Sequence, residues 1–191
     1  MPEEYPAPSE DLQFCPNCST PLTLRLLPTE DRPRLVCERD HILYVNPKLI
    51  VGVIPERRGR VLLMRRAIEP RHGAWTFPGG FMEIDETVEE CAVREAQEEV
   101  GVHVRLIQLV GVYSRPAPAA PGIVSIAYRG RVISGRVSPG REALEARWVR
   151  PEEIPWDDLA YETTRWALRD WLKARRDRSR KRVKRQRSNS P

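Results

Sequence analysis

The sequence has no long apolar run, and this absence excludes a membrane-spanning helix. Its longest uninterrupted apolar stretch runs from Leu49 to Ile54, whereas a helix needs about 20 apolar residues to cross a bilayer. The N-terminus, MPEEYPAPSEDLQ, lacks the basic start and the apolar core of a signal peptide. We therefore expect a cytoplasmic, mostly globular protein with one domain of ordinary size and a small module.

Cysteine is also scarce, with four residues in the chain. Four cysteines could form two disulfides in a secreted protein, but nothing indicates secretion, so metal binding is the better interpretation for three of them. Cys15 and Cys18 have the CxxC spacing with which two thiolates hold one tetrahedral Zn²⁺. Together with Cys37 and His41 they would form a Cys₃His structural site. We expect Cys91 to be a small buried hydrophobic residue instead.

The most informative feature is a cluster of three glutamates, Glu95, Glu98 and Glu99, at the helical spacings i, i+3 and i+4. Like charges at these spacings repel one another by about 0.2–0.5 kcal/mol per pair on an exposed helix. A hard divalent cation such as Mg²⁺ among the oxygens would make the cluster favourable. For an isolated ExxEE pattern, the alternative interpretation is an ordinary solvated helix face.

The helix that carries these glutamates is well specified by its flanking residues. Asp85 or Thr87 can cap its start, and Thr87 with Glu90 has the spacing of a capping box. Gly101 supplies the left-handed residue that ends it. Arg94 lies one turn from both Glu90 and Glu98, so it can hold a carboxylate in place. An apolar stripe packs the helix on a sheet and consists of Val88, Ala92, Ala96 and Val100.

The remaining sequence alternates between strand and helix patterns. A final amphipathic helix is predicted from about Glu162 to Arg175, with Trp166, Ala167 and Trp171 on its inner side. Strands are predicted at Lys48–Pro55, Arg60–Arg65, Val102–Tyr113, Ile123–Ile133 and Ala143–Val149. The stretch Gly73–Gly80 is predicted as a strand that runs into a Gly-Gly turn, where the backbone can approach a ligand closely. We divide the chain into a flexible N-terminus (1–13), a zinc-ribbon-like module (14–47), a main domain (48–172) and a basic tail (173–191).

The basic tail dominates the charge of the protein. It contains ten lysines and arginines and one aspartate, a net charge of +9, so the rest of the chain carries −4 of the total of +5. Such a run buries little apolar surface, and we expect it to be disordered. It can contact RNA, DNA or anionic membrane through counterion release. The alternative is a solubilising extension without a partner.

Fixed residues around the glutamate helix resemble the Nudix box, and none of them is missing. In this sequence the pattern consists of Gly80, Glu86, Arg94-Glu95, Ala96, Glu98-Glu99, Gly101 and Val102. Only Ala96 is smaller than the usual aliphatic residue. The resemblance continues in Tyr44-Val-Asn46-Pro47, in EPRHGAWTFPGG from Glu69 and in EIPWDDLA from Glu153. These segments are similar to Nudix hydrolases with an N-terminal zinc ribbon.

This resemblance implies an α/β fold, the Nudix α/β/α sandwich with a mixed sheet, and hydrolysis of a nucleoside diphosphate linked to another moiety. It implies Mg²⁺ or Mn²⁺ as cofactor, and relatives often form homodimers. The metal ligands by position are Glu95, Glu98, Glu99 and the Gly80 carbonyl. Glu86 and Arg94 are the pair that orients them. The attacking water would lose its proton to a box glutamate or to a downstream carboxylate, Glu142 or Glu145.

The substrate group that the resemblance favours is ADP-ribose or FAD, with AMP as one product. One alternative is NADH or NAD-cap cleavage, although the aromatic marker of those relatives, Ser-Gln-Pro-Trp-Pro-Phe-Pro, reads Ser114-Arg-Pro-Ala-Pro-Ala-Ala here. Another is a non-catalytic nucleotide- or nucleic-acid-binding protein. Candidate substrate contacts are Trp75, Phe77, Phe81 and Tyr113 for a base or flavin, Arg65, Arg66 and Arg71 for phosphate, and Glu145.

The ribbon departs from its family pattern at the second knuckle. There the family has another CxxC pair, whereas this chain has Asp40 three residues after Cys37 and no fourth ribbon cysteine. Two interpretations follow. Either His41 takes the place of the missing ligand and the module holds structural Zn²⁺, or the knuckle is held by packing alone.

Overall fold

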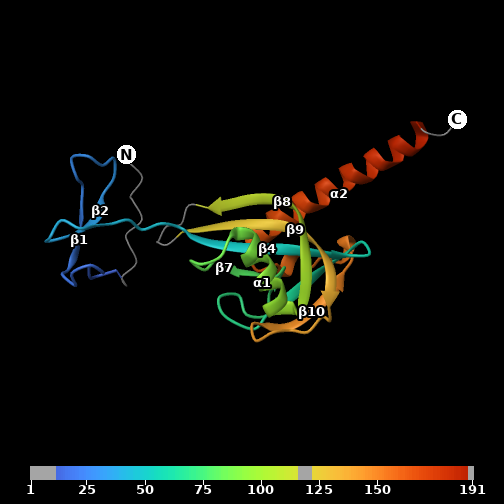
Figure 1. Cartoon of the computed structure of the whole chain (residues 1–191), viewed down its shortest axis with the longest axis horizontal. Coiled ribbons are helices and arrows are strands. Elements are labelled where there is room, and N and C mark those ends of the chain that lie inside the picture. The colour runs from blue at the N-terminus through green and yellow to red at the C-terminus, as the bar shows by residue number, and fades with distance from the viewer. Residues whose placement is uncertain (1–11, 116–121, 189–191) are drawn as a thin grey trace. The chain divides into compact units, whose positions relative to one another are not determined.

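The computed structural model describes residues 12–115 and 122–188 (Figure 1). The described residues form two compact units. The first comprises the residues up to Lys48 together with those between Ser114 and Val124, and the second comprises Leu49–Tyr113 and the residues from Ser125 onward. The domain boundaries given above stay predictions.

The first unit contains a small antiparallel sheet in the order β1-β2-β3. The strands are β1 (Leu22–Arg25), β2 (Arg34–Cys37) and β3 (Ile42–Leu43). Leu35, Val36 and Cys37 on the central strand are buried, whereas Leu24 and Leu26 are exposed. Units with so little apolar core usually need a metal or disulfides to fold.

The second unit is built on a seven-stranded sheet with the main order β10-β5-β4-β9-β8. Short β6 pairs with β5, and short β7 pairs with β4. The strands are β4 (Lys48–Arg57), β5 (Arg60–Arg66), β6 (Trp75–Thr76), β7 (Gly79–Phe81), β8 (Val102–Arg115), β9 (Ile123–Gly135) and β10 (Ala143–Val149). The stretch Gly73–Gly80 therefore contains the short β6 and the start of β7, and the expected Gly-Gly turn is wrong because Gly79 and Gly80 belong to β7. Pro78 lies between β6 and β7 and has no N–H to donate to a ladder.

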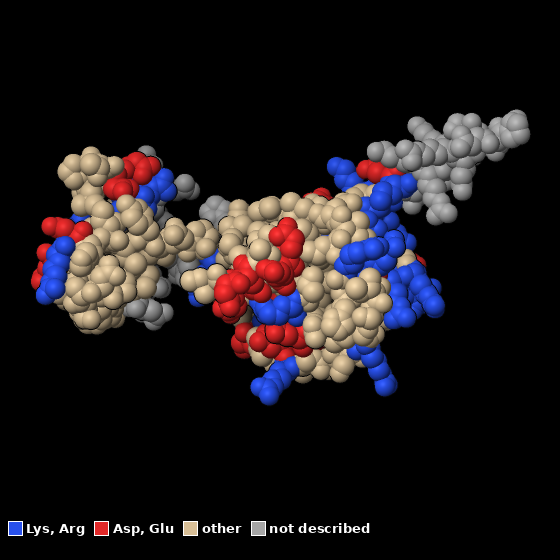
Figure 2. All heavy atoms as spheres, viewed as in Figure 1, with Lys and Arg blue, Asp and Glu red and all other residues tan. Residues whose placement is uncertain are grey.

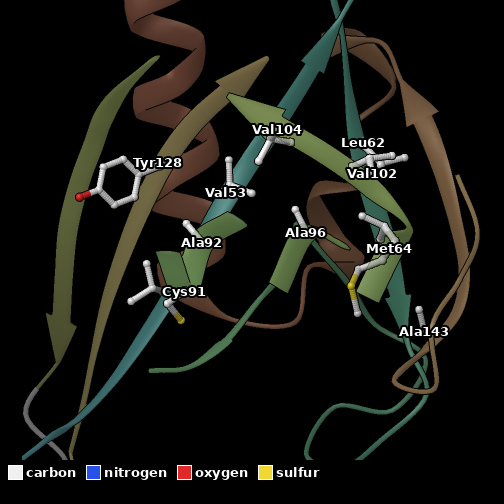
Figure 3. Close-up of a cluster of buried hydrophobic side chains, with 12 residues drawn as sticks. Val53, Leu62, Met64, Cys91, Ala92, Ala96, Val102, Val104, Tyr128 and Ala143 are labelled. Atoms are coloured by element: carbon white, nitrogen blue, oxygen red, sulfur yellow. The ribbon is translucent and has the colours of Figure 1, made fainter. Parts of the chain in front are cut away.

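Helix α1 (Val88–Val100) covers one face of this sheet. Side chains on a strand alternate between faces, and Leu62 and Met64 of β5 point toward α1 together with Val53 of β4 (Figure 3). They pack against Ala92 and Ala96, both fully buried. The small side chains of the helix stripe allow α1 to lie close to the strands, as the sequence predicts.

Helix α2 (Glu162–Ser188) covers the other face. The alternate β5 residues Val61 and Leu63 pack there against Ala167, Leu168 and Trp171. Two 3₁₀ turns, Pro151–Glu153 and Trp156–Asp158, connect β10 to this helix.

Helix α2 does not end near Arg175, where the sequence analysis placed its end, but continues to Ser188. The expectation of disorder from Lys173 is therefore wrong for residues 173–188. The segment has neither glycine nor proline, and Arg, Lys and Gln are strong helix formers, so the backbone stays helical without an apolar face. No helix among residues 12–115 and 122–188 is both long and apolar enough to span a membrane.

Candidate catalytic site and zinc centre

The caps of α1 form as the sequence predicts. The Thr87 hydroxyl accepts a hydrogen bond from the Glu90 amide at 3.2 Å, and the Glu90 carboxylate accepts one from the Thr87 amide at 2.8 Å. Gly101 ends the helix in the left-handed region with φ of 71°. Because the Glu90 carboxylate caps the helix, Arg94 binds other carboxylates instead. The position of the glutamates along the helix is fixed from both ends.

Glu95 is buried against the backbone of β7. A Cβ atom on Gly80 would lie 2.7 Å from the Glu95 carboxyl carbon, so only glycine leaves room for this side chain. Burial raises the pKa of the Glu95 carboxyl, an effect opposed by the ion pair with Arg94 at 2.6 Å. The Glu95 carboxylate therefore lies against the Cα atom of Gly80.

Glu99 is buried one turn further along the helix, with 5% of its surface exposed. It accepts a hydrogen bond from the Gly79 amide at 2.7 Å. Burial and the neighbouring carboxylates Glu95 and Glu142 raise the pKa of Glu99 to about 8. Glu98, by contrast, is exposed and pairs with Arg94 at 3.0 Å.

Arg94 connects the loop before α1 to the glutamates. Its guanidinium donates to both oxygens of Glu86, at 2.7 and 2.9 Å, and to the Phe81 carbonyl at 3.2 Å. Glu86 also accepts a hydrogen bond from the Glu83 amide at 2.8 Å. The bonds to Arg94 are the main reason that the pKa of Glu86 falls to about 2. Glu86 is therefore a fixed anion that holds Arg94 in place.

The loop before β10 brings a further carboxylate to the cluster. Its Ser138 and Gly140 amides donate to the Val100 and Glu99 carbonyls at 3.1 and 2.8 Å, which satisfies two carbonyls at the end of α1. The charge of Glu142, at the end of this loop, raises the pKa of both Glu95 and Glu99.

The second downstream candidate, Glu145, lies away from Glu95 and Glu99. It is exposed and lies opposite Arg65 in the β10–β5 pairing. Of the two downstream carboxylates, the fold therefore brings only Glu142 to the box.

Of the three arginines predicted to contact phosphate, Arg66 is the one whose charge acts on a box glutamate, Glu99. Arg66 is buried, donates to the Pro70 carbonyl at 3.0 Å and lies over the Tyr161 ring at 5.4 Å. Its positive charge opposes the rise in the pKa of Glu99. Sequence reasoning missed Tyr161, because no local signal links it to β5. Arg65 instead donates to the Gly73 carbonyl at 2.7 Å.

The aromatic candidates fall into two groups. Trp75, Phe77 and Tyr113 pack in the core on the α2 side, and the Arg147 guanidinium lies 4.3 Å from the Trp75 ring. Phe81 is half exposed at the start of the box. The structure does not bring the first three rings to the glutamates, and a stacking role for any of them stays a prediction. Arg71 is exposed in the loop after β5.

The donor set of the box suits a hard divalent cation. Carboxylate and carbonyl oxygens are the ligands that Mg²⁺ and Mn²⁺ prefer, and a cation would offset the repulsion between buried like charges. Figure 2 shows acidic side chains gathered around basic atoms on the face that carries α1. Glu95, Glu98, Glu99 and the Gly80 carbonyl are the groups that would hold the ion.

The four predicted zinc ligands come together in the first unit. The ligand atoms of Cys15, Cys18, Cys37 and His41 all lie within 4.8 Å of one another. The Sγ atoms of Cys18 and Cys37 are 3.6 Å apart, and Cys15 Sγ is 3.6 Å from His41 Nδ1. A tetrahedral site with Zn–S bonds of about 2.3 Å needs sulfur atoms about 3.8 Å apart, so the set fits zinc.

Two further observations support a ligand role for these residues. Hydrogen bonds from Thr20 lower the pKa of Cys18 to about 7, which favours the thiolate that binds metal. Asp40, which replaces a cysteine of the family pattern, is exposed and pairs with Arg25 at 3.4 Å. Within the described residues, this Cys/His set is the one group of three or more potential ligands gathered so closely.

Two family models match the chain. The NUDIX domain matches residues 46–172, and the Nudix N-terminal zinc-ribbon model matches residues 13–44. The chain belongs to the Nudix hydrolases. The predicted family, the sandwich fold with a mixed sheet and the pyrophosphohydrolase class are therefore confirmed.

Similar proteins include enzymes with different named substrates. An ADP-ribose pyrophosphatase of Methanocaldococcus jannaschii is 36% identical over 126 residues, which cover 64% of this chain and 75% of that protein. An NAD-capped RNA hydrolase of Vibrio parahaemolyticus is 30% identical over 156 residues, covering 80% of this chain and 56% of that protein. This chain thus spans only about half the length of such RNA hydrolases.

Among solved structures, a NUDIX hydrolase from Nitrosomonas europaea superposes with a TM-score of 0.80 at 38% identity. The match covers 86% of this chain and 93% of that protein. It therefore extends over most of the length of both chains.

Replacing Gly80 by alanine tests the cradle around Glu95. The added methyl group would collide with the carboxylate and displace it, so we expect Mn²⁺ affinity at the box to fall about tenfold or more, measured by isothermal titration calorimetry. Gly122→Ala is the matched control, because its methyl would only touch Pro47 at 3.9 Å. Unchanged Mn²⁺ affinity in Gly80→Ala would contradict this account of the site.

Proposed function

We propose that this protein hydrolyses the diphosphate bond of ADP-ribose or FAD and releases AMP. The observation that carries the proposal is the complete box, with Glu95 and Glu99 buried at β7 and Arg94 bound to Glu86. The relative from Methanocaldococcus jannaschii, named ADP-ribose pyrophosphatase, supports this substrate class.

The bound divalent cation, Mg²⁺ or Mn²⁺, would polarise the phosphoryl oxygens and lower the pKa of a water molecule. Glu95, Glu98 and Glu99 would hold the cation, and the Gly80 carbonyl would add a ligand. Arg94 donates hydrogen bonds to both Glu95 and Glu98 and so holds the two carboxylates in a fixed orientation. The buried environment of Glu95 and Glu99 strengthens their interaction with the metal, because the local dielectric constant is low.

Glu142 is the proposed general base. It lies in the loop whose amides cap the end of α1, and its charge acts on Glu95 and Glu99. A carboxylate there can take the proton of a water that attacks the bound diphosphate. Arg66, held by Pro70 and Tyr161, is the proposed contact to a substrate phosphate. Its buried guanidinium is already desolvated, which favours binding of an anion.

A second candidate function is cleavage of NADH or of the NAD cap of RNA. Several relatives with this name match about three quarters of this chain or more, including those from Vibrio parahaemolyticus and Photobacterium profundum. Both candidates require the same box chemistry and both release AMP or an AMP-bearing end. They differ in the group beyond the diphosphate.

We further propose that the first unit holds one structural Zn²⁺ through Cys15, Cys18, Cys37 and His41. The distances between the ligand atoms and the small core of this unit support the proposal. Zinc would then supply folding energy that the apolar residues of the unit do not provide. Homodimer formation stays a prediction.

A substrate panel separates the candidates. We expect Mg²⁺-dependent AMP release to be fastest with ADP-ribose or FAD, in a panel that also contains NADH, dinucleoside polyphosphates and nucleoside triphosphates. Glu98→Gln should lower turnover by at least about a hundredfold, because it removes a metal ligand. Glu152→Gln, an exposed glutamate in the turn after β10, is the control. Near-normal rates in Glu98→Gln would refute its role, and no AMP from any substrate would favour a non-catalytic binding protein.

The two downstream carboxylates make a matched pair. Glu142→Gln should lower kcat about a hundredfold with little change in KM, as expected for loss of a general base. Glu145→Gln should leave kcat within about twofold. Steady-state kinetics on the best substrate measure both. Equal effects, or a larger loss in Glu145→Gln, would show that Glu142 is not the base.

Elemental analysis tests the zinc site. We expect about one equivalent of zinc in the purified protein, and loss of this zinc in Cys18→Ser because a thiolate ligand disappears. Cys91→Ser is the control, since Cys91 lies in α1 and should not affect zinc content. Fully folded wild-type protein without zinc would contradict the proposal and favour a knuckle held by packing.

A further inference from the structure

Helix α2 is fixed to the body of the second unit well beyond its apolar part. Trp171 donates from its indole nitrogen to Glu56 at the end of β4, and Arg178 lies 3.9 Å from the same carboxylate. Arg175 donates to the Gly59 carbonyl in the β4–β5 turn at 2.8 Å. The start of the basic segment therefore lies against this turn.

The β4–β5 turn adds positive charge to that of the helix. Arg57, Arg58 and Arg60 are exposed there, as are Lys173 and Arg176 on the adjacent part of α2. We call these five residues the arginine surface. Figure 2 shows Lys and Arg side chains gathered where α2 leaves the sheet, away from the acidic face over α1.

The half-buried carboxylate of Glu56, at the end of β4, does not neutralise this surface. Glu56 already binds Arg129 through two hydrogen bonds of 2.7 Å. Burial and the charges of Arg129 and Arg175 lower the pKa of Arg178, the expected result where like charges accumulate. An external polyanion would relieve this repulsion.

The basic end of α2 contains at least one cationic residue for each phosphate of a nucleic acid strand of the same length. Residues 173–188 span about 24 Å, so their ten cationic residues supply one positive charge per about 2.4 Å. A single strand carries one phosphate per about 3.4 Å. A membrane surface fits less well, because a helix that lies on lipid needs an apolar face with Trp, Phe or Leu, and residues 173–188 contain none of these.

From these observations we infer that the arginine surface and the basic end of α2 bind a polynucleotide through its phosphodiester backbone. The contact is electrostatic and without sequence preference, because it is made to phosphate groups, which are the same at every nucleotide. RNA and DNA offer the same backbone charge. The inference does not depend on which small substrate the box hydrolyses.

Fluorescence anisotropy with a labelled 20-nucleotide single-stranded RNA tests the inference on the full-length protein. Arg57→Glu/Arg60→Glu should weaken binding about tenfold or more at 100 mM salt. It should also reduce the slope of log Kd against log salt by about 1.4, since each phosphate contact on a single strand contributes about 0.7. Lys173→Glu/Arg176→Glu should behave similarly, which provides a second variant if the first does not fold.

Arg39→Glu/Arg136→Glu is the matched control, with the same change in net charge at exposed positions outside the arginine surface. It should weaken binding less than about threefold, because neither residue belongs to the surface that is proposed to contact the strand. An equal loss in the control would overturn the inference, as would RNA binding too weak to detect at 50 mM salt.

Two comparison ligands complete the experiment. Single-stranded DNA of the same sequence should bind within about threefold of RNA, whereas a tenfold preference would overturn a contact made by the backbone alone. Tighter binding to phosphatidylserine vesicles than to RNA would favour a membrane and contradict the inference. Hydrolysis of the small substrate should be unchanged in the surface variants. The RNA-binding measurement therefore tests the arginine surface, and the hydrolysis measurement independently tests the proposed function.

Discussion

The burial of two neighbouring carboxylates on α1 is the constraint on which the catalytic unit depends. Glu95 and Glu99 are both nearly inaccessible, and each is matched to a backbone feature of β7: the missing Cβ of Gly80 and the amide of Gly79. Such contacts require the helix to lie very close to the strands, which the buried Ala92 and Ala96 allow. The short distance between helix and sheet therefore determines both the packing of α1 and the positions of Glu95 and Glu99.

The two units offer metals two different sets of ligands. The box provides oxygen atoms, which suit hard cations, and the ribbon provides three sulfur atoms and one imidazole nitrogen, which suit zinc. Because the ligand types differ, each site favours a different metal. His41, as the proposed fourth ligand in place of the missing cysteine, would keep this separation, since imidazole also favours zinc over magnesium.

Most of the features that could be predicted from the sequence depend on residue types and spacings that are local in the chain. The caps of α1, its apolar stripe and the zinc ligand set all follow from spacing within short segments, and the structure contains them. Glu142 and Tyr161 were harder to place, because only the tertiary fold brings Glu142 to the box glutamates and Tyr161 to Arg66. The basic end of α2 was wrongly expected to be disordered. Its composition suggested disorder, whereas its backbone follows helix propensity, which does not require an apolar face.

The hydrogen bonds from Ser138 and Gly140 to the end of α1 have a dynamic consequence. Loop and helix share these bonds, so neither can open locally without breaking contacts of the other. Their amide protons should therefore exchange with solvent as one cooperative segment rather than as a labile loop beside a stable helix. The carboxylate at the end of the loop would then leave and rejoin the helix glutamates in a single event, and partly assembled forms of the centre would be sparsely populated.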